Sequence, residues 1–382
     1  MAPVEAGRAD VIVVGAGPAG LAVGAVLRRA GLAPVLLERA SCVGARWHTH
    51  YERLHLHTAK RHSALPYVPF PASYPTYPSR LQVIDYLEGY ARQFALPIRF
   101  NQNVVSAERR DGLWEVATQD AAYQSRFLVV ATGLNEQPHV PTWPGQDSFD
   151  GPMLHSADYR NGEPFRGQDV LVIGFGNSGG EIAIDLWEHG AKPGLAVRSA
   201  VNVIFRDLLG IPVQQLSIAL SGLPPRISDA LTAPVRYLVY GDIGRYGLRK
   251  LPYGPVTQIR NDAQIPVIDV GVIRLIRAGR VRVYSGVREF TREGVTFTDG
   301  TTKPFGAVIL ATGYRAQAGA MFKEASRLTN HEGYPLVSGQ EAALAGLYFC
   351  GFHNAATGLL REIGLEAERI GKAIVQQRRS SS

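Results

Sequence analysis

The sequence is poor in cysteine: only Cys42 and Cys350 occur in 382 residues, and they form no Cys-x-x-Cys pair. A disulfide framework and a zinc site are therefore not expected, and the redox-active cysteine pair of a disulfide reductase is absent. So low a cysteine content is typical of a reducing compartment, and we expect a cytoplasmic protein without a metal site.

Long apolar runs are also missing, and none approaches the roughly 18–20 residues that a membrane-spanning helix requires. The apolar run at 11–14 is short and leads directly into a glycine-rich turn, which does not fit a signal peptide. Dense basic runs are absent although the net charge is +7, so an anionic cofactor explains the surplus more simply than nucleic acid. With 46% hydrophobic and 19% charged residues, the composition excludes a disordered, collagen-like or coiled-coil chain.

Glycine, in contrast, is abundant at 41 residues. One cluster, Gly15-Ala16-Gly17-Pro18-Ala19-Gly20, follows the apolar run 10–14, which is typical of a buried parallel strand. A helical pattern over 21–30 comes next, and a second strand over 34–37 leads to Glu38. The length of 382 residues exceeds the roughly 250–300 at which single cores stop growing, so we expect two domains.

Strand, glycine turn, helix and strand in this order form the context of the dinucleotide-binding fingerprint. Gly15 permits the tight turn, Gly17 lets the backbone approach a pyrophosphate, and Gly20 allows the helix to pack closely on the strand. The free N–H groups at the start of the helix attract phosphates. Glu38, 18 residues beyond Gly20, is placed to accept hydrogen bonds from ribose hydroxyls.

The same order returns in the middle of the chain. The apolar run 170–173 enters Gly174-Phe175-Gly176-Asn177-Ser178-Gly179, and a helical pattern over 181–189 ends at Gly190. The strand that follows, at 194–197, leads to Arg198-Ser199 in place of an acidic residue.

The residue after the second strand distinguishes the two sites. An acidic residue there selects a free ribose 2′-hydroxyl, whereas a cation accommodates a 2′-phosphate. We therefore expect FAD at the first glycine cluster and NADPH at the second, with Arg198 at the 2′-phosphate and Arg206 as a helper. The alternative for Arg198 is a solvated charge at the end of a strand.

Two further strands end in a small-Thr-Gly turn. The strand 127–130 enters Ala131-Thr132-Gly133, and the strand 307–310 enters Ala311-Thr312-Gly313. Turns of this kind suit places where the backbone passes close to a cofactor or changes domain. As a pair they indicate the two crossings between an FAD domain and an NADPH domain inserted into it.

The segment Phe149-Asp150-Gly151-Pro152-Met153-Leu154-His155-Ser156-Ala157-Asp158-Tyr159 lies between the two clusters. It resembles the identifying motif FxGxxxHxxx(F/Y) of the class B flavin monooxygenases, and the resemblance covers nearly the full length. Baeyer–Villiger relatives usually end this motif in Trp, so Tyr159 favours oxygenation at nitrogen or sulfur. In the family the motif lies between domains, which implies that His155 positions them.

Further segments resemble the YUCCA-type indole-3-pyruvate monooxygenases: 51–60, 65–78, 85–87, 174–179, 254–255 and 266–271. Animal-type relatives carry Asn at the position of His57, where it contacts NADP and the oxygenated flavin. The resemblance implies a cofactor-side, catalytic role for His57, with different hydrogen bonding; a core histidine is the alternative. Arg46-Trp47 matches a flavin contact, although Trp47 also suits a core aromatic.

The resemblance implies an NADPH- and O2-dependent monooxygenase that acts on a small organic substrate through a C4a-(hydro)peroxyflavin. No Ser-His-Asp triad or carboxylate pair stands out, and this chemistry requires none. The substrate stays open between an indole-type aromatic, an amine, a sulfide and a 2-oxo acid. Alternative functions are Baeyer–Villiger oxygenation of a ketone, an NADPH-dependent flavoprotein reductase, and a flavin-binding sensor without turnover.

The predicted cofactor contacts come from the glycine turns, the Thr-Gly turns and the family positions. They are Gly15, Gly17, Pro18, Ala19, Gly20, Glu38, Arg39, Arg46, Trp47, His57, Thr58, Val104, Ala131, Thr132, Gly133, His155, Gly174, Gly176, Asn177, Ser178, Gly179, Arg198, Ser199, Thr312, Gly313 and Gly351. Lys60 is interpreted either as a phosphate contact or as a solvent-facing side chain.

We expect an α/β protein with two Rossmann-like dinucleotide-binding domains. The FAD domain takes residues 1–160 and 313–382, and the inserted NADPH domain takes residues 161–312. An apolar insertion at about 200–262, broken by Pro224-Pro225, is interpreted as an access lid, a contact with a membrane surface or a helical pair that buries its own faces. The Pro- and aromatic-rich run 65–78 is expected to wall the flavin pocket rather than to act as a polyproline ligand. The oligomeric state stays open.

Overall fold

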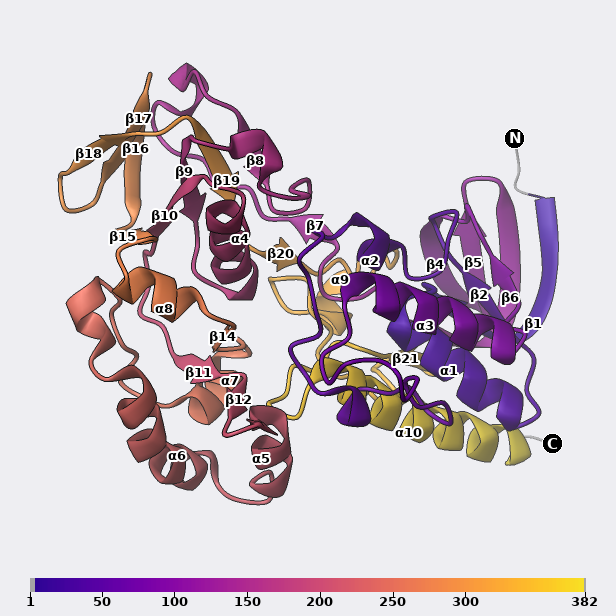
Figure 1. The fold of residues 1–382 in the computed structure, drawn as a ribbon. Coiled ribbons are helices and arrows are strands. Elements are labelled where there is room, and N and C mark those ends of the chain that lie inside the picture. Colours follow the sequence, from indigo (N-terminus) through magenta and orange to yellow (C-terminus); the bar gives the residue numbers. More distant parts are fainter. Residues whose placement is uncertain (1–3, 381–382) are drawn as a thin grey trace.

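The apolar run at 10–14 forms the end of a central strand, β1 (Val4–Val14), in the computed structural model, which describes residues 4–380 (Figure 1). The other strands of its seven-stranded sheet are β2 (Pro34–Leu37), β3 (Ile98–Arg99), β4 (Val104–Arg110), β5 (Leu113–Thr118), β6 (Ala121–Val130) and β21 (Leu347–Phe349). Their order is β3-β2-β1-β6-β5-β4, with β21 beside β6. The strands β1, β2, β3, β6 and β21 run parallel, and β4 and β5 add an antiparallel meander.

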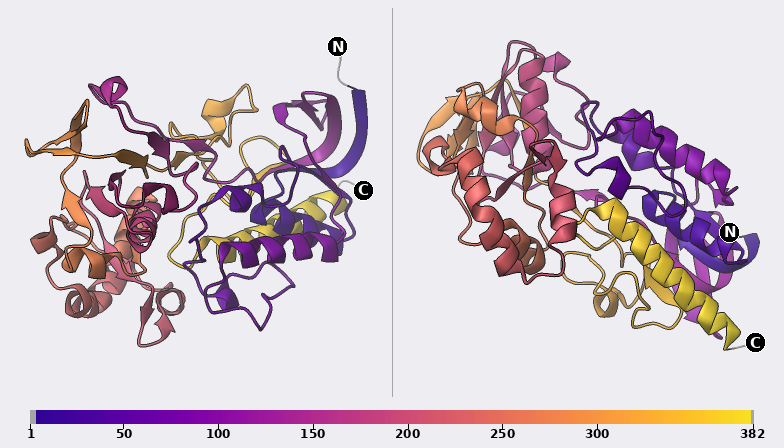
Figure 2. Two further views of the ribbon diagram at one scale, coloured as in Figure 1. Left: turned by 45° about the horizontal axis from the view of Figure 1, so that its top comes forward. Right: turned by 60° about the horizontal axis from the view of Figure 1, so that its bottom comes forward.

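Side chains alternate across this sheet, so it has a core on each face. Val11 and Val13 pack with three helices, α1 (Pro18–Arg29), α3 (Arg80–Gln93) and α10 (Leu359–Arg379). Ile12 and Val14 belong to the other core, which contains Trp114. Figure 2 shows from two further directions that α10 runs along this domain.

The second glycine cluster belongs to a second, fully parallel sheet of five strands. These are β8 (Met153–His155), β9 (Asp169–Ile173), β10 (Lys192–Ala196), β15 (Arg282–Tyr284) and β19 (Ala307–Leu310), in the order β15-β10-β9-β19-β8. One face packs with α4 (Asn177–Glu188) and α8 (Val272–Arg277). The other face is covered by an antiparallel sheet of β16 (Val287–Thr291), β17 (Gly294–Phe297) and β18 (Thr302–Pro304).

The apolar insertion leaves this sheet after β10. Its elements are β11 (Val203–Phe205), β12 (Asp207–Leu208), β13 (Ile211–Pro212), α5 (Val213–Ala219), α6 (Pro225–Tyr240), η4 (Ile243–Tyr246), α7 (Pro255–Asp262) and β14 (Val267–Asp269). As expected from Pro224-Pro225, the helical region is broken: α5 ends at Ala219 and α6 begins at Pro225. The outer side of α6 exposes apolar side chains, among them Ile227, Leu231 and Leu238.

The two chain crossings between the domains lie side by side. β7 (Gln137–Pro138), which follows the first Thr-Gly turn, pairs antiparallel with β20 (Tyr314–Arg315), which follows the second. The remaining short elements are α2 (Ala45–Thr49), η1 (Lys60–His62), η2 (Gln146–Ser148), η3 (Glu163–Phe165) and α9 (Ala325–Leu328).

The expected fold class is confirmed: two parallel-sheet dinucleotide domains, the second inserted into the first. The bounds assigned to the domains stay a prediction, and β8 at 153–155 joins the second sheet although it precedes the boundary placed after residue 160. Among residues 4–380, no helix is long and apolar enough to cross a membrane.

Candidate functional site

The first glycine turn has the backbone geometry that a dinucleotide requires. Gly15 has φ of +108°, and a Cβ there would lie 2.6 Å from the carbonyl oxygen of Ala131. A Cβ at Gly20 would clash with the carbonyl oxygen of Gly15, whereas one at Gly17 would meet no atom within 4 Å. Gly15 and Gly20 therefore serve the packing of the turn, and Gly17 leaves open space in front of the backbone, where a pyrophosphate fits.

The second turn repeats this geometry. Gly174 has φ of +106°, and a Cβ at this residue would clash with the carbonyl oxygen of Ala311. A Cβ at Gly179 would clash with the carbonyl oxygen of Gly174. Gly176, like Gly17, has nothing within 4 Å of a Cβ. We call the two turns, 15–20 and 174–179, the first and the second cradle. In both, the space next to the second glycine, where a methyl group would stand, is free, and a dinucleotide pyrophosphate fits there.

Both helices begin earlier than the sequence patterns predict, at Pro18 instead of 21 and at Asn177 instead of 181. Gly17 and Gly176 are the N-cap residues, and no side chain caps either helix. Pro18 suits the first helical position because its φ is already fixed. The uncapped first-turn N–H groups therefore remain donors for phosphate.

Glu38 lies at the end of β2 and is 8% exposed. Its carboxylate accepts hydrogen bonds from the backbone N–H groups of Ala16, at 2.7 Å, and Ala40, at 2.9 Å. These bonds fix the carboxylate beside the first cradle. A carboxylate has further lone pairs, which can accept from ribose hydroxyls.

Arg198 lies at the end of β10, exposed, and belongs to the same cavity as the second cradle. Arg249 donates to its backbone carbonyl, so the local backbone is tied to the segment after α6. Arg206, the predicted helper, instead pairs with Asp207 at 3.2 Å and lies over the ring of Tyr77.

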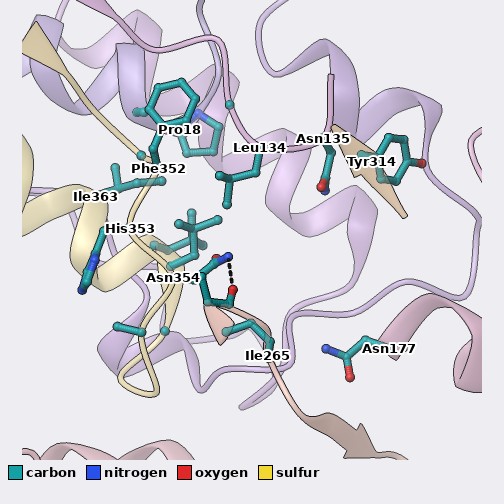
Figure 3. Close-up of a pocket in the computed structure, with 18 of the residues that line it drawn as sticks. Pro18, Leu134, Asn135, Asn177, Ile265, Tyr314, Phe352, His353, Asn354 and Ile363 are labelled. Carbon is teal, nitrogen blue, oxygen red and sulfur yellow. Dashed lines mark hydrogen bonds between the residues drawn. The ribbon is translucent and has the colours of Figure 1, made fainter. Parts of the chain in front are cut away.

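One cavity of about 2110 Å³ joins both cradles. Figure 3 shows side chains of both domains around it: Pro18, Leu134 and Phe352 on one side, Ile265 and Asn177 on the other. Asn354, which also lines the cavity, donates to the carbonyl oxygen of Ala263 at 3.1 Å. The cofactor ends and a substrate can therefore meet in one cavity between the domains.

Most of the predicted contacts line this cavity. They are Gly15, Gly17, Pro18, Ala19, Glu38, Arg39, Arg46, Trp47, His57, Thr58, Val104, Ala131, Thr132, Gly133, Asn177, Ser178, Arg198, Thr312 and Gly351. Gly20, Gly174, Gly176, Gly179, Ser199 and Gly313 are not in its wall. Of these, Gly20, Gly174 and Gly179 serve the packing of the turns, and Gly176 has open space in front of its backbone.

His155 is not in the cavity wall either. It is 5% exposed, its Nε2 lies 3.1 Å from the carbonyl oxygen of Gly313, and its Nδ1 accepts from the N–H of Ala157 at 3.1 Å. Its ring stands edge-on to Tyr314 of β20, with centroids 5.1 Å apart. Burial lowers the pKa of His155. These contacts place His155 at the crossing between the domains, against the second Thr-Gly turn, and its predicted cofactor contact stays a prediction.

A cluster of charged residues borders the first cradle. Arg39 pairs with Glu136 at 3.0 Å, and Arg46 donates to the backbone carbonyl of Glu136 at 2.8 Å. Burial raises the pKa of the Glu136 carboxyl, and both arginines oppose that rise. The guanidinium of Arg46 also lies 5.5 Å from the centre of the Tyr314 ring. The cluster therefore fixes Arg46 at the cavity beside the crossing strand.

The segment after His57 is tied to the loop that follows it. Lys60 is partly exposed, and its ammonium donates to the carbonyl oxygens of Pro71, Ala72 and Tyr74, while a phosphate contact of Lys60 stays a prediction. The run 65–78 is a folded loop, but none of its residues lines the cavity. It packs on α3, where the hydroxyl of Tyr90 donates to the carbonyl of Pro66 at 2.9 Å.

Three buried side chains at the site were missed. Glu181 of α4 is hydrogen-bonded to Nε2 of His57. Gln214 of α5 accepts from the N–H of Ala59 at 2.8 Å and donates to the carbonyl of Thr357 at 2.6 Å. Glu366 of α10 accepts from the N–H of Gly351 at 2.6 Å, and burial raises the pKa of its carboxyl. Each joins segments far apart in sequence, and a local pattern gives no signal for such contacts.

Comparison with known proteins agrees with this geometry. The family model described as pyridine nucleotide-disulphide oxidoreductase matches residues 12–204. The chain is 39% identical to indole-3-pyruvate monooxygenase YUCCA4 of Oryza sativa, over 96% of this chain and 87% of that protein. It is also 39% identical to indole-3-pyruvate monooxygenase YUCCA6 of Arabidopsis thaliana, over 95% of this chain and 89% of that protein.

Solved structures give the same result. A double mutant of the flavin monooxygenase from Stenotrophomonas maltophilia superposes with a TM-score of 0.75 and 25% identity, over 97% of this chain and 99% of that chain. Cyclohexanone monooxygenase from a Rhodococcus species shares the fold, with a TM-score of 0.75 and 19% identity over 99% of this chain and 85% of that one.

The cofactors are FAD and NADPH, and both glycine cradles fit a dinucleotide. The enzyme is an FAD-dependent NADPH monooxygenase that acts on a small molecule. The similarity to the plant enzymes over nearly the whole chain agrees with the two cradles and the cavity that they share. The chain therefore belongs to the flavin-dependent monooxygenases, in the YUCCA-type group.

Proposed function

We propose that the chain catalyses the oxidative decarboxylation of an indole-type 2-oxo acid, with indole-3-pyruvate as the first candidate. The overall reaction is R–CH2–CO–COO⁻ + O2 + NADPH + H⁺ → R–CH2–COO⁻ + CO2 + H2O + NADP⁺. One oxygen atom enters the new carboxylate and the other leaves as water, while NADPH supplies both electrons. Support for this substrate comes from the names of the relatives, which cover most of the chain.

One observation carries the proposal: a single cavity connects both cradles, and beside its charged and polar stretches one part of its wall combines apolar side chains with amides. Leu134, Ile265 and Phe352 offer apolar contacts to an aromatic ring, while Asn177 and Asn354 offer polar ones. Ligand sites of this kind combine apolar walls with few polar groups that fix orientation. An indole ring could lie against the apolar side chains, and a short oxo-acid side chain could bind the amides.

The residues of the chain bind, orient and exclude water. Gly17 and Gly176 open their cradles to the pyrophosphates, and Glu38 and Arg198 are proposed to select a 2′-hydroxyl and a 2′-phosphate respectively. When bound, the flavin accepts hydride from NADPH and activates O2. Phe352 and Leu134 keep water from the meeting point of cofactors and substrate.

We also propose that His57 contacts the cofactors. The proposal is supported by the place of His57 in the cavity wall, with its Nε2 engaged by Glu181. The cytoplasmic location is likewise a proposal, supported by the two cysteines, both of them free thiols. A membrane contact or a second copy at the exposed apolar face of α6 stays untested.

The direct test is turnover of the purified holoprotein with NADPH, indole-3-pyruvate and isotopically labelled O2. We expect indole-3-acetate with one labelled oxygen, one CO2 and one NADP⁺ per product. A cyclic ketone, a sulfide and a tertiary amine are run in parallel. Lactone formation from the ketone, or faster oxygenation of the sulfide or amine with no acetate from the oxo acid, would overturn the substrate proposal.

A further inference from the structure

The segment 51–57 of the FAD domain docks along one face of α4, the helix that begins at the NADPH cradle. Burial raises the pKa of the Tyr51 hydroxyl well above its ordinary value, so the hydroxyl stays protonated, and it is hydrogen-bonded to Ser178. His57 contacts Glu181, and Arg53 pairs with Glu188. Ser178, Glu181 and Glu188 are spaced by three and seven residues, so they share one side of the helix.

Tyr51 and Ser178 line the cavity, and the pair of His57 and Glu181 joins a side chain of the cavity wall to a buried carboxylate behind it. His57 lies in the cavity wall, whereas Glu181 does not and is 4% exposed. Glu181 therefore stands behind His57, shielded from solvent. Within residues 4–380, the imidazole of His57 is the hydrogen-bond partner of the Glu181 carboxylate. Removing either partner leaves a buried polar group without its hydrogen bond.

The chemistry of the pair fixes the orientation of the ring. An ionised carboxylate only accepts hydrogen bonds, so Nε2 of His57 carries the proton in this contact. Nδ1 then remains as the ring nitrogen for a contact on the cavity side. The same carboxylate sits one turn after Asn177 and Ser178, which line the cavity at the NADPH cradle.

We propose that Glu181 is a positioning residue: it holds His57 toward the cavity and thereby ties the NADPH cradle to the flavin side of the site. This inference rests on the proposed role of His57 and goes beyond it, because it assigns a function to a residue that does not touch cofactor or substrate. Its consequence is that Glu181 limits the wasteful reaction NADPH + H⁺ + O2 → NADP⁺ + H2O2.

The test measures NADPH oxidation and H2O2 release without organic substrate, so its result does not depend on the identity of that substrate. A charge-assisted hydrogen bond is worth about tenfold or more in an equilibrium constant, so we expect Glu181→Ala to raise this rate about tenfold. The KM for NADPH should change by less than about twofold, because Glu181 lies behind His57 and outside the cavity wall. Glu181→Gln, which keeps an accepting oxygen for Nε2–H, should restore most of the wild-type behaviour.

A double variant of His57 and Glu181 distinguishes a positioning role of Glu181 from a general effect on the structure. If Glu181 acts through His57, the variant His57→Ala/Glu181→Ala leaks peroxide no faster than His57→Ala alone. Asp185→Asn is the matched control, a buried carboxylate of α4 that accepts from Tyr159 at 2.6 Å away from the cavity wall. We expect it to lower the melting temperature but not to raise the leak.

The assignment would be overturned if the increases in H2O2 release of the two single variants add up in the double variant. It would also be overturned if Glu181→Ala raised the KM for NADPH and left H2O2 release unchanged. FAD content and melting temperature are recorded for every variant. Should Glu181→Ala fail to retain FAD, Glu181→Met, which fills the space of Glu181 but offers no carboxylate oxygen to Nε2–H, is compared in the His57 and the His57→Asn backgrounds. The proposal then requires that the increase in H2O2 release caused by Glu181→Met disappear when His57 is replaced.

Discussion

At the residue scale, Arg198 is the side chain that we propose selects NADPH over NADH. It is exposed at the end of β10 and lines the cavity beside the second cradle. We expect Arg198→Ala to raise the KM for NADPH about 10- to 100-fold and to leave that for NADH nearly unchanged, since a lost charge-assisted contact is worth about 1.5–3 kcal/mol. Arg282→Ala on the neighbouring strand β15 is the control, an exposed arginine outside the cavity wall. Equal NADPH preference in the two variants would remove Arg198 from the 2′-phosphate site.

His50 gives the protein a predictable response to acid. Burial, with Arg46, Arg80 and Arg160 nearby, lowers its pKa from 6.5 to about 4. The unfolded chain therefore binds the proton more readily than the folded one. The stabilising contribution is complete above about pH 6.5 and is lost as the pH falls toward 4, with about 2 kcal/mol gone at pH 5.

Urea unfolding of the holoprotein at about pH 7.5 and about pH 5 measures this effect. His50→Gln should show a smaller drop between the two conditions than the wild type. His48→Gln, at an exposed position of α2 two residues before His50, should show the same drop as the wild type. The same pH slope in all three proteins would mean that His50 does not titrate as described.

At the element scale, α5 is tied to the FAD domain through Gln214. This side chain is 3% exposed and bonds the backbone at Ala59 and at Thr357. Without it, two buried backbone groups lose their partner, which costs about 1–3 kcal/mol. We therefore expect Gln214→Ala to increase amide hydrogen exchange across 213–219, whereas Gln215→Ala, at an exposed neighbour, should not. Unchanged exchange in Gln214→Ala would show that α5 is held by other contacts.

The elements differ in how far the sequence could predict them. The glycine turns and their strands were predicted correctly because φ > 0 at Gly15 and the close approach at Gly20 are local requirements. The loop 65–78 was misplaced, because Lys60 and Tyr90 bind its carbonyl groups and draw it onto α3, away from the cavity. Glu181 was missed for a related reason: a carboxylate inside a helix pattern looks solvated until its partner, 124 residues away, is known.

At the scale of the whole molecule, the assignment of one cofactor to each domain is open to a paired test. A methyl group at Gly17 or Gly176 finds free space in the protein but occupies the place of a pyrophosphate. We expect Gly17→Ala to fold and lose FAD, and Gly176→Ala to keep FAD and show an increased KM for NADPH. Flavin absorbance, the melting temperature and NADPH kinetics report the three quantities. Loss of FAD from Gly176→Ala with retention in Gly17→Ala would reverse the assignment.

The pairing of β7 with β20 has a consequence for how this architecture can change over evolution. Because the chain leaves the first domain and re-enters it at strands that hydrogen-bond to each other, the ends of the inserted segment 139–313 emerge next to one another. An inserted unit with adjacent ends behaves as a cassette, which recombination can exchange without moving the sheet into which it is set. Such an exchange must preserve the contacts that α4 and α5 make with the FAD domain. The strand pair β7–β20 can therefore accept different inserted units, whereas the contacts between the two domains are specific to each enzyme.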